Sequence, residues 1–109
     1  MKGKIVLIPF PFTDLTGTKL RPALVLVEGE EDCVVAFISS RVPARPSTTE
    51  ILIPEDHEEF ARTGLKRASI VRLDKVATVS KSLMLGEIGE IGEVLRGDIN
   101  RRLREIFQL

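Results

Sequence analysis

Short apolar runs separated by turn-forming residues make up most of the chain, and this pattern predicts a β-rich fold. Isoleucine, valine and leucine fill the runs, and these residue types favour the pleated surface of a strand. Proline, glycine, aspartate and threonine separate them, and these residues form turns through their backbone preferences and local hydrogen bonds. The predicted strands cover residues 4–10, 21–27, 33–38, 48–53, 68–79 and 83–88.

The runs differ in how much burial they predict. Residues 33–38, CVVAFI, include no polar position, which indicates a strand buried on both faces. Residues 68–79 are long enough for one bent strand or two. Pro22 is expected among the first positions of its strand, because proline cannot donate to a central ladder. Loops are predicted over residues 11–20 and 39–47.

The end of the chain changes to a helical period. Residues 93–107 predict the one long helix, while residues 54–62 can form one or two helical turns with Pro54 near the start. Many short strands followed by one helix indicate a mainly β fold, either a small antiparallel barrel or a strongly curved sheet with the helix packed on it. We expect residues 1–109 to form one domain. The predicted apolar face of the long helix comprises Ile91, Val94, Leu95, Ile99, Leu103, Ile106 and Phe107.

Composition restricts the chemistry available to this chain. Cys33 is the only cysteine and His57 the only histidine, which excludes an internal disulfide, a thiolate cluster and a multi-histidine metal site in one subunit. We therefore expect no metal and no cofactor, with Cys33 buried and His57 at the surface. No apolar run approaches the ~18–20 residues needed to span a bilayer. The expected location is the cytoplasm, without a membrane partner.

Charge alternates in blocks along the chain, although the formal net charge is zero. Residues 28–33 carry four acids and no base, and residues 48–60 carry five acids. Residues 61–81 hold six basic groups and one acid. Such blocks allow a fold to gather one sign of charge on one face, although solvated surface charge is the ordinary explanation.

Two sets of polar residues stand at the ends of predicted strands, and a third stands within one. Arg21 lies where a loop enters an apolar strand, a common place for a functional side chain, although a surface arginine is the alternative. Residues 39–41, Ser-Ser-Arg, leave the predicted buried strand together, and simple turn formation is the alternative. Arg72 and Asp74 are two residues apart in a strand, so they point to one face. Their alternative is a local ion pair of little energetic weight.

These groups belong to longer runs that resemble the MazF/PemK toxins of bacterial toxin–antitoxin pairs. The runs are GKIVLIPFPFTDLTGTKLRPALVLV, VVAFISSR and GLKRASIVRLDKVATVSKSLM, in this order and over nearly the whole chain. The arginine-proline pair entering an apolar strand is the most specific piece. The resemblance implies an SH3-like (CcdB/PemK-like) barrel with a terminal helix, usually a homodimer. It also implies a metal-independent endoribonuclease that cuts single-stranded RNA at short sequences.

The resemblance further implies which residues form the site. The proposed catalytic group is Arg21, Ser39, Arg72 and Asp74. Ser39 stands where many relatives have threonine, and it keeps the hydroxyl but loses the methyl that restricts its rotamer. A histidine that PemK-like relatives use in the first loop has no counterpart here. RNA contacts are expected from Thr13, Asp14, Thr16, Thr18, Lys19, Ser40, Arg41, Lys66 and Arg67.

The implied reaction is attack of an RNA 2′-hydroxyl on the adjacent phosphate, which leaves a 2′,3′-cyclic phosphate. Arg21 and Arg72 would clamp the phosphate because the guanidinium fork matches its oxygens, and Ser39 would hydrogen-bond one of them. Asp74 would act as the base, or Arg21 if its environment permits. An arginine has a pKa of about 12 or higher, which favours electrostatic stabilisation as its role.

Two other functions stay open at the level of the sequence. One is a non-catalytic toxin of the same fold, as in the CcdB-like toxins, which inhibits a protein such as DNA gyrase. The other is a catalytically faded toxin that acts as a binding module. The expected partners are single-stranded RNA, a second copy of the chain, and a small antitoxin whose acidic, disordered tail could lie across the basic loops.

Overall fold

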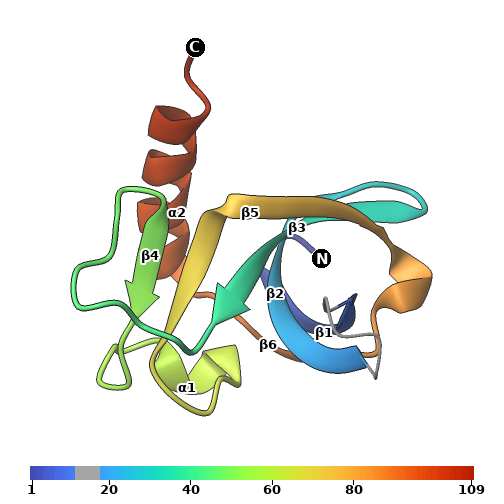
Figure 1. The fold of residues 1–109 in the computed structure, drawn as a ribbon, viewed down its shortest axis with the longest axis horizontal. Helices are drawn as coiled ribbons and strands as arrows, with labels where there is room; N and C mark the ends of the chain where they lie inside the picture. Colours follow the sequence, from blue (N-terminus) through green and yellow to red (C-terminus); the bar gives the residue numbers. More distant parts are fainter. Residues whose placement is uncertain (12–17) are drawn as a thin grey trace.

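Strongly curled antiparallel strands form the body of the protein, with one long helix beside them (Figure 1). The computed structural model describes residues 1–11 and 18–109. Within these residues the strands form one sheet in the order β4-β5-β3-β2-β1-β6. The elements are β1 Lys4–Pro11, β2 Thr18–Glu28, β3 Asp32–Ser39, β4 Glu50–Ile53, α1 Phe60–Thr63, β5 Ser69–Ser80, the 3-10 turn Lys81–Leu83, β6 Gly86–Glu90 and α2 Glu93–Ile106. The predicted mainly β fold with a C-terminal helix is confirmed.

The boundary of the second strand differs from the prediction. Residues 18–20 belong to β2 and not to a loop, because they pair with the end of β1, as in Phe10↔Lys19. Pro22 is consequently the fifth residue of β2 and not one of its first. The position is tolerated because the ladder to β3 begins only at Ala23, so Pro22 pairs with β1 alone.

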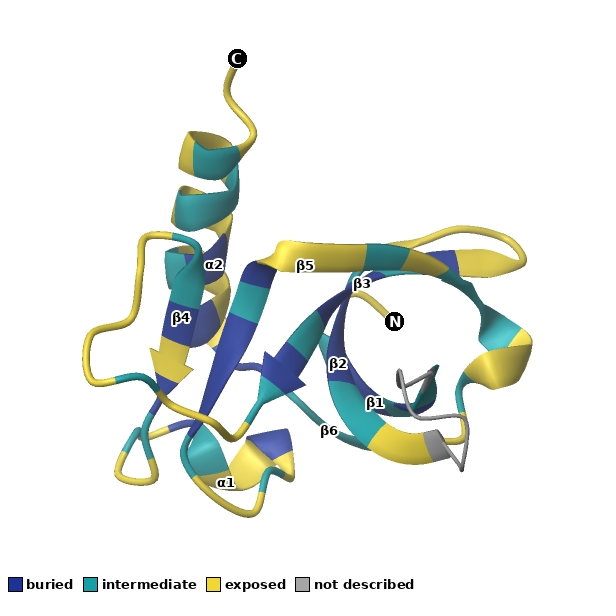
Figure 2. Ribbon diagram, in the orientation of Figure 1, coloured by how far each residue is buried: buried dark blue, intermediate teal, exposed yellow. Residues whose placement is uncertain are grey.

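The apolar runs are explained by two core clusters on the two faces of the sheet. Ile5 and Leu24 face the cluster shared with α2, whereas their neighbours Val6 and Val25 face the inside of the curl. Adjacent strand residues point to opposite faces, so covering both faces requires continuous apolar runs. Figure 2 shows the buried residues concentrated along the strands and along one side of α2. Cys33 is buried in the inner cluster, as expected.

The helix α2 packs through a narrower stripe than predicted. Ile91 just before it, and Leu95 and Ile99 within it, are buried at four-residue spacing. Val94 and Phe107 are exposed by 46% and 58%, so these two predicted core positions are wrong. Val94 lies to one side of the stripe, and Phe107 lies at the end of α2 that extends past the sheet (Figure 1).

The region predicted as one or two helical turns is helical only in its last part. Residues 54–59 form turns, with the His57 N–H donating to the Pro54 carbonyl, and α1 begins at Phe60. His57 is half-buried, not fully at the surface, and its Nδ1 accepts the backbone N–H of Glu59 at 2.9 Å. The backbone of this region places the Glu59 side chain against the start of α2.

Glu59 satisfies the first amides of α2 from 35 residues away. Gly92 precedes the helix and has no side chain to cap it. The Glu59 carboxylate instead accepts the N–H of Val94 at 2.7 Å and of Leu95 at 2.9 Å. Burial alone would raise the pKa of Glu59, but these N–H groups outweigh it and the pKa is lowered. A carboxylate at a helix N-terminus is stabilised both by these donors and by the helix dipole.

No helix among the residues that the structure describes is long and apolar enough to cross a membrane.

Candidate functional site

The pairing of the strands brings three of the predicted catalytic residues to one face of the sheet. Phe37 of β3 lies directly opposite Arg72 of β5, so their side chains share a face. Ser39 is two residues beyond Phe37 and keeps that face. Arg21 is two residues before Ala23, which lies opposite Phe37 on the other side of β3. Arg21, Ser39 and Arg72 therefore converge at the end of β3, on the inner side of the curl.

These side chains line a hollow of about 590 Å³, which we call the Arg72 hollow. Its described lining includes five basic residues and no acidic one. The volume lies within the range of about 300–1,000 Å³ that is usual for small-ligand sites. A concave surface of this charge is suited to an anionic group. Its predicted site residues are Lys19, Arg21, Ser39, Arg41 and Arg72.

Arg72 is held in place by two carboxylates. Its Nε and Nη2 donate to the two oxygens of Asp74, both at 3.2 Å, and Glu50 lies 3.6 Å from Nε. The predicted common face of Arg72 and Asp74 is confirmed, and so is the local ion pair. The bonds to Asp74 raise the pKa of Arg72, and the same bonds lower the pKa of Asp74. The guanidinium thus has a fixed orientation at the hollow.

Ser39 forms a turn as well as lining the hollow. Its Oγ accepts the backbone N–H of Arg41 at 3.1 Å, which is the turn chemistry that the sequence left as an alternative. The hydroxyl proton is not used by this bond, so Ser39 can still donate to an anion. The turn also directs the chain so that Arg41 follows onto the same hollow.

A second hollow, of about 480 Å³, is lined by three more of the predicted RNA contacts. We call it the Leu65 hollow, after a residue of the loop between α1 and β5 that lines it. Ser40, Lys66 and Arg67 line this second hollow and not the first. Arg21 and Ile38 line both hollows, so the two meet there. Ser39 is the last residue of β3 and Ser40 the first residue after it, so the split falls where the strand ends.

Four predicted RNA contacts and one predicted catalytic residue are not among the described lining residues of either hollow. Thr13, Asp14 and Thr16 lie outside the described residues. Thr18 is the first residue of β2 and pairs with Pro11 of β1. Asp74 contacts Arg72 but does not itself line either hollow.

Sequence reasoning missed four residues of the Arg72 hollow, which are Phe10, Phe37, Ile38 and Lys75, and also Glu50 beside it. Phe10 and Phe37 meet edge to face, with ring centroids 4.5 Å apart at 87°, and both line the hollow. The alternation of Phe37 with Ser39 was an available signal for one of them. Lys75 had no such signal, because a three-residue spacing in a strand normally separates it from Arg72. Glu50 contacts Arg72 only because β4 pairs with β5.

An irregularity in β5 explains the position of Lys75. Ala36 of β3 lies opposite Val76, yet the next residue, Phe37, lies opposite Arg72, so residues 73–75 have no partners in β3. The Leu73 N–H instead donates to the carbonyl of Thr49, just before β4. Extra residues of this kind bend a strand and redirect its side chains. The bend is visible in β5 where it passes from β4 onto the curl (Figure 1).

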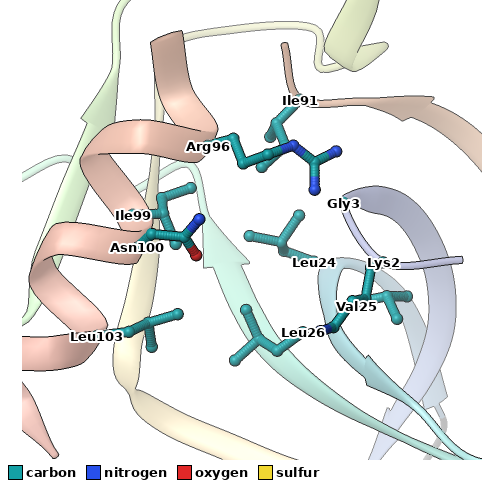
Figure 3. Close-up of a pocket in the computed structure, with 10 residues that line it drawn as sticks. All are labelled: Lys2, Gly3, Leu24, Val25, Leu26, Ile91, Arg96, Ile99, Asn100 and Leu103. Atoms are coloured by element: carbon teal, nitrogen blue, oxygen red, sulfur yellow. The ribbon is translucent and has the colours of Figure 1, made fainter. Parts of the chain in front are cut away.

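A smaller hollow of about 250 Å³ lies between α2 and β2, where Figure 3 shows its lining. Leu24, Leu26 and Leu103 form apolar walls, and Arg96 and Asn100 project from the helix. It contains none of the predicted site residues. Among the described residues, no group of three or more His, Cys, Asp or Glu side chains is arranged to hold a metal ion.

Comparison with known proteins identifies the family of this chain. The sequence profile of the PemK-like, MazF-like toxins of type II toxin–antitoxin systems matches residues 1–107. The chain belongs to this toxin family. No sequence among the curated proteins matches it.

Solved structures of this toxin fold are similar over nearly their full length. A Mycobacterium tuberculosis toxin, MazF-mt6, has a TM-score of 0.75 and 22% identity, with 97% of each chain covered. An endoribonuclease in complex with its cognate antitoxin, from a mycobacterial species, has a TM-score of 0.72 and 18% identity. That match covers 100% of this chain and 95% of the other. At these identities the similarity establishes the shared fold.

Proposed function

We propose that this member of the toxin family is a metal-independent endoribonuclease that cuts single-stranded RNA at short sequences. The observation that carries the proposal is the convergence of Arg21, Ser39 and Arg72 on one basic hollow. Two guanidinium groups and a hydroxyl match the oxygens of a phosphate diester. A structurally similar mycobacterial protein is named an endoribonuclease, which supports the same activity for this chain.

The proposed reaction uses the 2′-hydroxyl of the substrate as nucleophile. Its oxygen gives up its proton to a base and attacks the adjacent phosphorus. The bond to the 5′-oxygen of the next nucleotide breaks and that oxygen takes up a proton, so a 2′,3′-cyclic phosphate and a 5′-hydroxyl remain. Negative charge grows on the phosphoryl oxygens during attack, and the guanidinium groups of Arg21 and Arg72 stabilise it. Ser39 donates a hydrogen bond to one of these oxygens. DNA is not cut because it lacks the nucleophile.

Asp74 has two candidate roles in this scheme. The first is to accept the 2′-hydroxyl proton, for which its lowered pKa keeps it ionised but makes it a weak base near neutral pH. The second is to orient Arg72 through the paired bonds of 3.2 Å. The second role uses a contact that the structure contains, so we assign Asp74 first to positioning Arg72.

The decisive experiment maps the ends of cut RNA. The purified protein is incubated with a long single-stranded RNA in the presence of EDTA, and the ends of the fragments are analysed. We expect cleavage with 2′,3′-cyclic phosphate and 5′-hydroxyl ends, and no cleavage by Arg21→Ala. Fragments with 5′-phosphate ends, or loss of activity in EDTA, would contradict the mechanism. A wild-type protein that leaves RNA intact but still stops growth would favour the non-catalytic toxin that inhibits a protein such as DNA gyrase.

Two protein partners complete the proposal. A structurally similar protein is solved with its cognate antitoxin, and we infer a corresponding antitoxin here, with an acidic segment that lies across the Arg72 hollow. The second partner is another copy of this chain. The sheet face beside α2 has apolar side chains that α2 does not cover, including Val76 at 40% exposure. Apolar surface of this kind is typical of subunit interfaces.

A further inference from the structure

We propose that the Leu65 hollow binds one nucleobase of the substrate strand, adjacent to the phosphate held in the Arg72 hollow, and so sets part of the cleavage sequence. This inference rests on the proposed ribonuclease activity. It assigns sequence recognition to a surface distinct from the residues that stabilise the reacting phosphate. The occupant is a base and not a phosphate because the hollow combines an apolar floor with a basic rim.

The floor of the Leu65 hollow comes from four separate elements. Leu7 of β1, Leu20 and Pro22 of β2, Ile88 of β6 and Leu65 supply its apolar side chains. The Leu20 side chain is exposed by 51%, which leaves apolar surface in contact with water. A ligand with an apolar face can stabilise the complex by covering this surface. A nucleobase has two such faces, and stacking a base on protein groups is worth about 1–3 kcal/mol in other proteins.

The rim of the hollow carries cations that the fold does not use. Lys66 and Arg67 are exposed, and neither is in any ion pair among residues 1–11 and 18–109. By contrast, Lys4, Arg62 and Lys81 are each paired with a glutamate. Uncommitted cations beside an apolar floor suit a nucleotide, whose base contacts the floor while its phosphate contacts the rim.

The loop that supplies these cations is fixed before any ligand arrives. Gly64 has a φ of 74°, and a Cβ at this residue would overlap the backbone carbonyl of Ile88 in β6. The Thr63 hydroxyl accepts the Leu65 N–H at 3.2 Å and donates to the Phe60 carbonyl at 2.6 Å. At the other end of the loop, the Ser69 hydroxyl donates to the Arg67 carbonyl at 2.9 Å. A wall held at both ends loses little conformational entropy on binding.

The two hollows are placed for neighbouring nucleotides of one strand. They meet at Arg21 and Ile38, at the end of β3. The ladder between β2 and β3 ends at Ala23↔Phe37, so these two strands are not paired where the hollows meet. Adjacent hollows that share lining residues suit neighbouring nucleotides of one extended RNA strand. Single-stranded RNA is recognised in this way, with its bases splayed into separate pockets.

The test is a selection of bound sequences from a randomised RNA pool whose 2′-hydroxyls are methylated, so that the pool cannot be cut. We expect the wild-type protein to select a preferred base at a position next to the cut site. Leu20→Ala and Leu65→Ala should each reduce that preference by about ten-fold, the usual effect of trimming an apolar recognition pocket. Preferences at other positions should stay. Leu52→Ala, which trims an exposed leucine of β4, is the matched control and should change nothing.

The outcomes separate this inference from the proposed activity. If both variants keep every preference, or if the wild-type protein does not bind the pool, the inference is wrong. If the pool is bound with the expected preference but unmethylated RNA is never cut, the proposed activity fails while the base site stands. If the variants instead lose binding to an acidic peptide and keep all base preferences, the hollow serves a protein partner and the inference is overturned. Leu20 is largely exposed, so its variant tests the site even if Leu65→Ala does not fold.

Discussion

Arg72 shows how single residues act together in this protein. A guanidinium in solution can rotate, but here Asp74 binds two of its nitrogens and Glu50 approaches one of them. The bidentate geometry fixes the plane of the group, which is the condition for electrostatic preorganisation. Glu50 is the more buried carboxylate, with its side chain 13% exposed against 39% for Asp74. Its removal would leave Arg72 with one anchor.

The pH dependence of cleavage tests the role of Asp74. Its pKa lies below the ordinary value of 3.8, so the carboxylate is ionised throughout the range from about pH 5 to 8. We expect a single-turnover rate that changes little across this range. Asp74→Asn should lower the rate by a similar factor, about 100-fold, at every pH in the range. A loss of rate in Asp74→Asn that shrinks as the pH rises would contradict the positioning role, because hydroxide can replace a lost base but not a lost anchor for Arg72.

The capping contact of Glu59 leads to a prediction about the free energy of unfolding. Glu59→Ala leaves two amides of α2 without their acceptor, and we expect it to lower the free energy of unfolding by about 1–2 kcal/mol at pH 7. Because the folded pKa is lowered from 4.5, this contribution is fully present above pH 4.5 and is lost as the pH falls through the folded value. Urea unfolding of both proteins at pH 7 and pH 3 measures the difference. An unchanged gap at pH 3 would contradict the capping role.

At the scale of elements, the conformation of the loop from α1 to β5 depends on a single glycine. Gly64 ends α1 in the left-handed region, and its lack of a side chain lets the loop lie directly on β6. The same contact holds Lys66 and Arg67 at the Leu65 hollow. The bend in β5 similarly places Lys75 beside Arg72.

Two glycine-to-alanine substitutions compare a glycine that the loop requires with one that the fold does not require. Gly64→Ala adds a Cβ against the carbonyl of Ile88 and requires a positive φ, so we expect a loss of at least about 2 kcal/mol in unfolding free energy. Gly97→Ala in α2 is the control, because a Cβ added there would meet no other part of the described protein within 4 Å. Alanine in a helix interior should stabilise the protein there by about 0.5–1 kcal/mol. Thermal unfolding of the two variants should therefore shift in opposite directions.

At the scale of the whole molecule, α2 covers only part of its side of the sheet. Leu24 lies opposite Ala36, and Ala36 lies opposite Val76, so the three side chains form one row on the α2 side. Leu24 and Ala36 are buried, whereas Val76 is exposed by 40%. Phe107, exposed by 58%, follows the last turn of α2. Uncovered apolar groups beside a buried core favour association with a second copy.

Solution mass tests this association. We expect the wild-type protein to have the mass of a dimer in light scattering after gel filtration, and Val76→Asp to weaken it because a charge would be buried in the interface. Val42→Asp is the matched control, since Val42 is exposed by 39% in the loop after β3. Circular dichroism should show both variants folded. A monomeric wild-type protein, or equal effects of the two variants, would contradict this interface.

Local periodicity and short motifs were enough to predict most of the strands, the long helix and the resemblance to a toxin family. The common face of Arg72 and Asp74 also followed from two-residue spacing alone. Tertiary structure was needed to show which groups meet across strands. The bend in β5 brings Lys75 to the Arg72 hollow, β4 brings Glu50 to Arg72, and Glu59 caps a helix 35 residues away. No local pattern encodes such contacts, because they arise from the pairing register and packing of distant segments.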